Sequence, residues 1–166
     1  MDLTEKYRLL LGQLKFDYMD MKDPSGKFKH HWASSIKPGL PTQAKMIRLS
    51  QELADLSNSL PIEHTNSIFV RVDESRVDVM KAMIMGSAGT PYGHGAFEYD
   101  VYFGDNYPQG PPLVNLTTTG GGQVRFNPNL YNNGKVCLSL LGTWSGSGGE
   151  KWNPDLSTFL QVLLSI

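Results

Sequence analysis

The sequence predicts one α+β domain, with helices before and after a small antiparallel sheet. Apolar residues recur at helical spacing near the start, between residues 42 and 60, and at the end of the chain. Between residues 67 and 118 the pattern changes to short strand-like stretches separated by Gly- and Pro-rich loops. Because these connections are short, we expect a four-stranded antiparallel meander rather than parallel pairing. With 166 residues, the chain is long enough for one sizeable core.

The first forty residues are predicted to form an N-terminal extension, residues 1–40, ahead of a core domain at residues 41–166. A short amphipathic helix opens the extension, because its apolar side chains follow helical spacing: Leu3, Tyr7, Leu10, Leu11 and Leu14. Residues 15–40 then lose this periodicity and contain two turn signals, Asp23-Pro24-Ser25-Gly26 and Lys37-Pro38-Gly39. We expect the segment Lys27–Trp32 to be a partly ordered stretch of surface.

A second helix is predicted between Thr42, which suits an N-cap, and Pro61, which ends the helical run. Its apolar stripe steps by three and four residues: Met46, Leu49, Leu53, Leu56 and Leu60. The opposite face carries charges: Lys45, Arg48, Glu52 and Asp55. Because a charged helix face is ordinarily solvated, we expect this one to face water unless a partner docks on it.

Four strands and a last helix follow. The first two strands, Ser67–Val72 and Val77–Met85, flank a hairpin-like connection. The third, at residues 96–103, has the period of two that marks a half-buried strand, with Phe97, Tyr99, Val101 and Phe103 on one face. The fourth strand is Leu113–Thr118. The last helix begins after Pro154 and is still apolar at Ile166, so we expect the chain to be cut short before further C-terminal helices.

Composition excludes several classes of function. Hydrophobic residues make up 40% of the chain and charged residues 19%, as in ordinary soluble globular proteins. The 15 basic and 16 acidic side chains give no excess of positive charge for nucleic-acid binding. No apolar run approaches the roughly 18 residues of a membrane span. The start of the chain is acidic where a secretory signal is basic, and one cysteine excludes an internal disulfide. We therefore expect a cytoplasmic protein without membrane contact.

Cys137 is the residue best placed for chemistry. It lies between apolar neighbours, after a polar turn that contains Asn127, Asn129, Asn132 and Asn133. A nucleophile beside amide donors suits acyl transfer, in which a tetrahedral oxyanion needs stabilising. A lone cysteine is more often a small buried hydrophobe, and that alternative stays open at this point.

A cysteine hydrolase is a further alternative, and it needs a base, usually histidine, beside the thiol. The chain has four histidines, and none lies in the segments that flank the cysteine: His30, His31, His64 and His94. One cysteine and scattered histidines match no zinc spacing, and Gly120-Gly121-Gly122 lacks the Lys-Ser/Thr of a phosphate-binding loop. We expect neither a metal nor a cofactor.

The chain resembles the ubiquitin-conjugating (E2) family in four motifs, which occur in the same order as in that family. They are Pro91-Tyr92 with Gly95-Ala96-Phe97, Tyr107-Pro108 with Pro111-Pro112, Phe126-Asn127-Pro128-Asn129-Leu130-Tyr131, and Gly134-Lys135-Val136-Cys137-Leu138. The resemblance spans about residues 42–166 and implies the ubiquitin-conjugating (UBC) fold, with an N-terminal helix, the meander, a catalytic cysteine loop and a central helix. Residues 1–40 and the loop Trp144–Trp152 further resemble one branch. Its members are giant inhibitor-of-apoptosis proteins of the BRUCE/Apollon type, whose E2 domain acts as both E2 and ubiquitin ligase.

The resemblance implies that Cys137 accepts ubiquitin from the activating enzyme E1 as a thioester and passes it to a substrate lysine. It also implies that Asn129 stabilises the oxyanion or the loop, and that Lys45 and Arg48 lie on the helix face that meets E1. The implied partners are ubiquitin, E1 and protein substrates, with an E3 ligase or the rest of the chain's own polypeptide besides. ATP is used by E1 and not by this domain. The alternative is an inactive E2-like fragment that only binds ubiquitin, although such variants lack the cysteine that is present here.

Several positions depart from the family pattern. Asn127 replaces the motif histidine, and Ser139 stands where aspartate is frequent. Gln109 replaces a loop aromatic that ligases often grip, and Asn153-Pro154-Asp155 replaces the usual Ser-Pro-Ala. These departures argue against docking of an ordinary RING or HECT ligase, and they fit a domain that works within its own large ligase.

Overall fold

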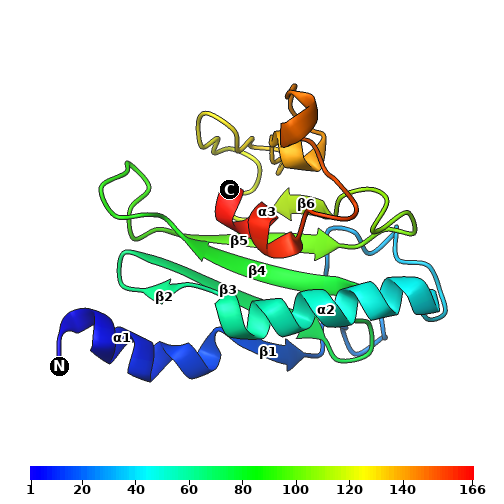
Figure 1. The fold of residues 1–166 in the computed structure, drawn as a ribbon, viewed down its shortest axis with the longest axis horizontal. Helices are drawn as coiled ribbons and strands as arrows, with labels where there is room; N and C mark the ends of the chain where they lie inside the picture. The colour runs from blue at the N-terminus through cyan, green and yellow to red at the C-terminus, as the bar shows by residue number, and fades with distance from the viewer.

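The computed structural model describes all 166 residues, and a six-stranded sheet lies at its centre (Figure 1). The helices are α1 (Leu3–Leu11), α2 (Gln43–Ser59) and α3 (Phe159–Ser165). The strands are β1 (Phe16–Met19), β2 (Ile62–Glu63), β3 (Asn66–Asp73), β4 (Val79–Met85), β5 (Ala96–Tyr102) and β6 (Leu113–Leu116). Short 3-10 helices cover Gly12–Leu14, Ser139–Leu141 and Gly148–Glu150. Helices α2 and α3 contact each other and lie in front of the sheet in this view.

The predicted meander is confirmed, because β3, β4, β5 and β6 pair antiparallel in chain order. Two further strands were not predicted. Both pair with β3 at the edge of the sheet opposite β6. Strand β2 is antiparallel to β3, whereas β1 is parallel to it and places Phe16 opposite Val70. A parallel neighbour needs a long connection, which residues 20–65 supply through the N-terminal segment and α2. The sheet is therefore mixed, and residues from the N-terminal extension belong to it.

Helix α2 follows the prediction closely. The hydroxyl of Thr42 accepts a hydrogen bond from the Lys45 backbone N–H, as an N-cap does. In the apolar stripe, Leu49, Leu56 and Leu60 are buried in the main core, whereas Met46 in the first turn is 37% exposed. The stripe thus packs the helix onto the sheet through its centre and its C-terminal end.

The segment Lys27–Trp32 is only partly a surface stretch: Lys27, Lys29 and His31 are exposed as predicted, whereas His30 is buried and Phe28 and Trp32 are half-buried. The ring of buried His30 donates from Nε2 to the Met80 carbonyl at 2.9 Å. The backbone N–H of His31 donates to the Asp100 carboxylate at 2.7 Å. An apolar cluster forms beneath these contacts from Met21, Val79 and Tyr102, with Phe28, Trp32 and Ile36 packed on it. The segment covers the far face of the sheet, behind the strands in Figure 1.

This cover also changes the third predicted strand. The first half of β5 alternates in burial as predicted, but its second half is buried on both faces, including Asp100 and Tyr102. The last helix is confirmed but starts later than predicted, at Phe159 after the N-cap Thr158. No helix in the structure combines the length and the apolar character needed to cross a bilayer.

Candidate active site

The loop that precedes Cys137 is folded back on itself by backbone hydrogen bonds. Phe126 and Leu130 exchange two of them, at 2.8 and 3.0 Å, around the cis peptide bond between Asn127 and Pro128. The chain then turns again, and the backbone N–H of Cys137 donates to the carbonyl of Asn129 at 2.9 Å. The structure therefore brings together the two residues that the sequence singled out.

The thiol side of the loop is close to the core. Cys137 is 5% exposed, and its neighbour Val136 belongs to the main hydrophobic cluster. The hydroxyl of Thr143 donates to the Val136 carbonyl at 2.6 Å and accepts from the Leu138 N–H at 3.0 Å. Thr143 thus holds the main chain on both sides of the cysteine. Sequence reasoning missed this residue, because a threonine in a Gly- and Ser-rich stretch carries no signal of its own.

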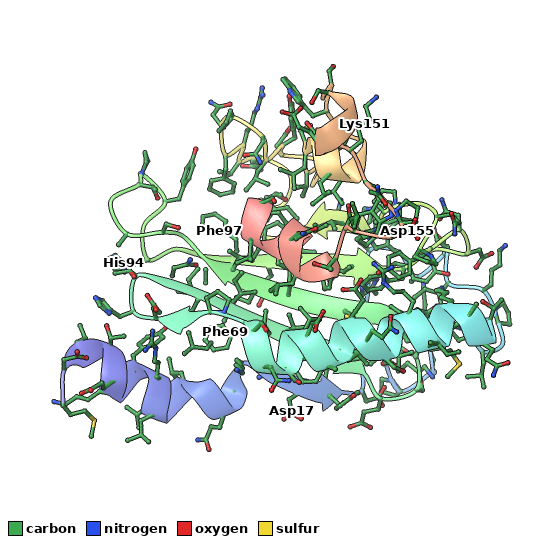
Figure 2. All side chains as sticks on the ribbon, viewed as in Figure 1. Asp17, Phe69, His94, Phe97, Lys151 and Asp155 are labelled. Atoms are coloured by element: carbon green, nitrogen blue, oxygen red, sulfur yellow. The ribbon has the colours of Figure 1, made fainter.

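Residues from other parts of the chain also contact the loop Phe126–Tyr131. The Tyr92 hydroxyl donates to the Asn127 carbonyl at 2.8 Å, and the Tyr92 ring meets the Phe126 ring edge-on with centroids 5.6 Å apart. Phe97, at the start of β5 (Figure 2), completes this aromatic group, with its centroid 5.0 Å from that of Phe126. The Asn129 side chain is half-buried and makes no hydrogen bond within the chain. Its amide is therefore free to donate to a group from outside.

None of the four histidines is hydrogen-bonded to Cys137. His30 is bound to the Met80 carbonyl, and His64 lies 3.0 Å from the Thr4 hydroxyl through Nδ1. His94 lies on the loop between β4 and β5, at the edge of the molecule in Figure 2. No three side chains of His, Cys, Asp or Glu type gather where they could hold a metal ion. The arrangement of base and nucleophile that a cysteine hydrolase needs is absent.

Lys45 does not face water, so the prediction of an E1-docking surface at this residue is wrong. Its side chain is 4% exposed, and its ammonium lies 2.8 Å from a carboxylate oxygen of Asp78. The Arg76 guanidinium also binds Asp78, through Nε and Nη2, each at 2.9 Å. Burial alone raises the pKa of the Asp78 carboxyl, but hydrogen bonds from Arg76 and Lys45 more than offset this, and its pKa lies below the ordinary value.

Arg48 is likewise engaged within the molecule, which corrects the same prediction. It binds Glu52 at 3.0 Å and donates to the backbone carbonyls of Pro154 and Ser157 at 2.6 and 2.5 Å. Glu52 is buried and also accepts from the Phe159 N–H at 2.9 Å. This face of α2 therefore joins α2 to the C-terminal segment. Among the charges predicted to face water, only that of Asp55 does so.

The family of the chain follows from its relatives. The sequence profile of the ubiquitin-conjugating enzyme family matches residues 48–166. The structure of human ubiquitin-conjugating enzyme E2 G1 superposes with a TM-score of 0.60 at 26% identity, covering 76% of this chain and 93% of that one. The chain therefore belongs to the ubiquitin-conjugating enzyme family and has the UBC fold, as predicted.

Individual relatives show which branch of the ubiquitin-conjugating family this chain resembles. Over 99% of this chain, 54% of residues are identical to the human dual E2 ubiquitin-conjugating enzyme/E3 ubiquitin-protein ligase BIRC6, a giant protein of which the chain spans 4%. Over 81% of the chain, 51% are identical to the probable ubiquitin-conjugating enzyme protein 17 of Caenorhabditis elegans, of which it spans 18%. The resemblance to the BRUCE/Apollon branch is confirmed by the first of these likenesses.

Proposed function

We propose that this domain is an active E2, in which Cys137 accepts ubiquitin from E1 as a thioester and passes it to a lysine of a protein substrate. The main support is the 2.9 Å backbone hydrogen bond from Cys137 to Asn129, which holds the motif asparagine beside the family's cysteine position. E1, ubiquitin and protein substrates are the proposed partners. ATP is consumed at E1, and the domain itself uses no cofactor.

The first half-reaction exchanges one thioester for another. The Cys137 thiolate attacks the carbonyl carbon of the E1-ubiquitin thioester, the new carbon–sulfur bond forms, and the E1 thiolate leaves. Because one thioester replaces another, the exchange is near energetic balance. A cysteine thiolate is intrinsically nucleophilic, so this step needs no strong base. The absence of a histidine at Cys137 is therefore compatible with the chemistry.

The second half-reaction forms an amide. The lysine amine attacks the Cys137 thioester, loses a proton, and expels the Cys137 thiolate as a good leaving group. Negative charge develops on the carbonyl oxygen in between, and a fixed amide donor stabilises it in the transition state. The Asn129 side chain is available for this role, since it has no hydrogen-bond partner within the chain.

A hybrid role as E2 and ligase is proposed for the larger polypeptide, in the cytoplasm. The printed name of the human relative describes a dual E2 and E3 enzyme. Gln109 replaces the loop aromatic that ligases often grip, and it is exposed between Pro108 and Gly110. We therefore propose that substrates are brought to this domain by its own polypeptide, or by a ligase that does not depend on the loop aromatic.

The proposal is tested by charging. The chain is incubated with E1, ATP and ubiquitin and run on a gel without reductant, with and without prior thiol treatment. We expect a thiol-sensitive adduct for the native chain, a slower thiol-resistant oxyester for Cys137→Ser, and no adduct for Cys137→Ala. Ser139→Ala, two residues away, serves as the control and should charge. An adduct that persists in Cys137→Ala would refute the assignment.

A further inference from the structure

Trp144 is an exposed tryptophan in the loop that follows the cysteine. The residue is 59% exposed, although tryptophan is highly buried on average. The other two tryptophans of the chain use their indole N–H groups, Trp32 for the Asp100 carbonyl at 3.3 Å and Trp152 for the Pro108 carbonyl at 2.8 Å. The Trp144 indole N–H makes no hydrogen bond within the chain, so both its ring and its donor are available to a partner.

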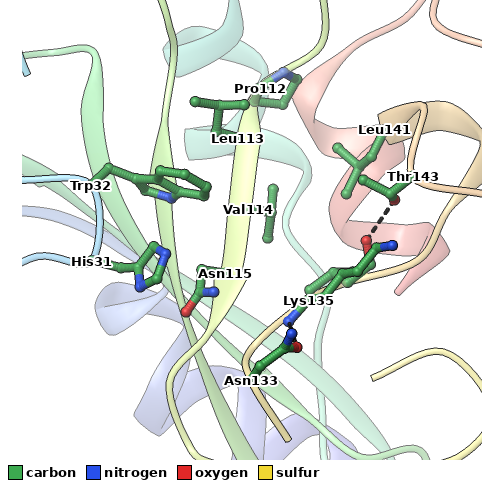
Figure 3. A pocket seen from close by; sticks show the side chains of 11 residues that line it. His31, Trp32, Pro112, Leu113, Val114, Asn115, Asn133, Lys135, Leu141 and Thr143 are labelled. Carbon is green, nitrogen blue, oxygen red and sulfur yellow. Dashed lines mark hydrogen bonds between the residues drawn. The ribbon is translucent and has the colours of Figure 1, made fainter. Parts of the chain in front are cut away.

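Thr143 fixes the place of Trp144 relative to Cys137. The Thr143 hydroxyl donates to the Val136 carbonyl at 2.6 Å, along the line dashed from Thr143 in Figure 3, and accepts from the Leu138 N–H at 3.0 Å. The Thr143 backbone N–H also donates to the Leu138 carbonyl at 3.2 Å. Thr143 is thus bonded to the main chain on both sides of the cysteine, and the Trp144 Cα atom follows about 3.8 Å further along the chain. The indole therefore begins close enough to reach a group that is bonded to the Cys137 sulfur.

The rest of the loop is ordered as well. It folds back onto Ser139, because a methyl group built on Gly146 would lie 2.6 Å from the Ser139 Cβ atom, and a side chain there would push the two segments apart. The loop ends in a short 3-10 helix, where the Glu150 carboxylate accepts from the Ser147 N–H at 2.8 Å. In Figure 1 the loop is drawn in orange, above the sheet. A tryptophan on an ordered loop loses less conformational freedom on binding, which favours affinity.

The occupant of this site follows from the cysteine. Cys137 is 5% exposed, so a protein joined to its sulfur can reach it only through a narrow, extended end segment, and that segment contacts the residues around the sulfur. In the proposed E2 reaction, on which this inference rests, the segment is the C-terminal end of ubiquitin. A flat exposed indole packs well on an extended chain and can donate its N–H to one of the backbone carbonyls. We propose that Trp144 is a positioning residue, which packs on the C-terminal segment of the ubiquitin carried by Cys137 and holds the thioester for attack by lysine.

NMR of the linked complex tests the contact. The ¹⁵N-labelled Cys137→Ser chain is joined to unlabelled ubiquitin as an oxyester by E1 and ATP, and then purified. We expect the Trp144 indole resonance to shift and its hydrogen exchange with water to slow. The Trp152 indole, already bonded to the Pro108 carbonyl, is the internal control and should not move. Free ubiquitin mixed with the same variant, without E1 and ATP, should leave Trp144 unchanged, because the contact depends on the linkage.

The possible failures are distinguishable. A purified adduct whose Trp144 indole does not shift would overturn the inference and leave the E2 assignment intact, and Trp144 would then be free for E1 or a ligase. A shift with free ubiquitin alone would show docking of the folded ubiquitin surface and would also overturn it. Failure of the folded chain to form any adduct would overturn both the inference and the proposed function.

Lysine discharge separates positioning from folding. A preformed Cys137 thioester of Trp144→Ala should discharge to free lysine about tenfold more slowly than that of the native chain, as for the loss of an interface anchor. Trp144→Phe keeps a flat ring and should recover most of the rate. Leu9→Ala truncates an apolar side chain of α1 that is 68% exposed, and this control should discharge like the native chain. Discharge of Trp144→Ala at the native rate, or a slow discharge accompanied by a lower Tm, would contradict a positioning role.

Discussion

Replacing Glu52 with alanine should lower the free energy of unfolding, because it removes the contact between α2 and the C-terminal part of the chain. The Glu52 side chain is 1% exposed and accepts three hydrogen bonds. They come from Arg48 Nε at 3.0 Å, from the Tyr107 hydroxyl at 2.6 Å and from the Phe159 N–H at 2.9 Å. Two of these donors are 55 and 107 residues away in the sequence, so one carboxylate joins three distant segments.

The expected loss in the free energy of unfolding follows from the groups that Glu52→Ala leaves without a partner. Glu52→Ala leaves the Arg48 cation, with 18% of its side chain exposed, without its carboxylate, and two further buried donors without an acceptor. Breaking a buried ion pair by removing one partner costs about 3–5 kcal/mol. For a domain of this size each kcal/mol lowers Tm by about 2–4 °C, so we expect a fall of about 6–20 °C. Glu52→Gln keeps one acceptor oxygen and should lose less.

Urea unfolding followed by circular dichroism, together with thermal melting, measures this loss. Glu74→Ala is the matched control, because this exposed carboxylate makes no side-chain hydrogen bond, and its effect should stay within about 0.5 kcal/mol. A loss below about 1 kcal/mol for Glu52→Ala, an ordinary value for a single substitution, would show that the buried carboxylate is not the tie between these segments.

Three further predictions concern other buried or catalytic groups. Lys45→Glu sets a second carboxylate beside Asp78 and should destabilise the fold by about 3–5 kcal/mol in urea unfolding. The control Lys6→Glu, on the exposed α1, should be neutral. Equal effects of the two changes would contradict the buried ion pair. Asn129→Ala should slow lysine discharge by about 10²–10³-fold while charging slows less, and equal slowing would indicate a structural role. Burial lowers the pKa of His30, and its bond to a carbonyl offsets this only in part, so the unfolded state takes up the proton first as pH falls. Stability present above pH 6.5 should therefore fall as the pH drops below 6.5, and His30→Gln should flatten that slope. An unchanged slope in the variant would refute this origin.

The parts of the fold that the sequence predicts well depend on neighbours along the chain. The stripe of α2 and its N-cap at Thr42 are set within a few residues, and so is the meander, whose strands are joined by short loops. The meeting of Asn129 and Cys137 is local as well, because only seven residues separate them in a tight loop. Periodicity and motif spacing describe such features directly.

The errors concern residues whose partners are far away in the sequence. Lys45 and Glu52 share the buried stripe of α2 with Leu49 and Leu56, so their spacing is that of the core face and only their charge suggested a solvated one. The carboxylate that pairs with Lys45 is 33 residues away, and the carbonyls that bind Arg48 are 106 and 109 residues away. The N-terminal segment has no periodicity that a sequence pattern could detect. Its position is set by hydrogen bonds from His30 and His31 to Met80 and Asp100, which are far away in the sequence. The identity of these distant partners is not contained in any local pattern.

Intact-mass spectrometry after incubation with E1, ATP and ubiquitin measures the proposed thioester most directly. We expect a species with the mass of the chain plus ubiquitin minus one water, which returns to the free chain on treatment with thiol. Peptide mapping at acidic pH should place the linkage on Cys137. The absence of any adduct with a demonstrably folded chain, or an adduct on lysine that resists thiol, would contradict the assignment of Cys137 as the ubiquitin carrier.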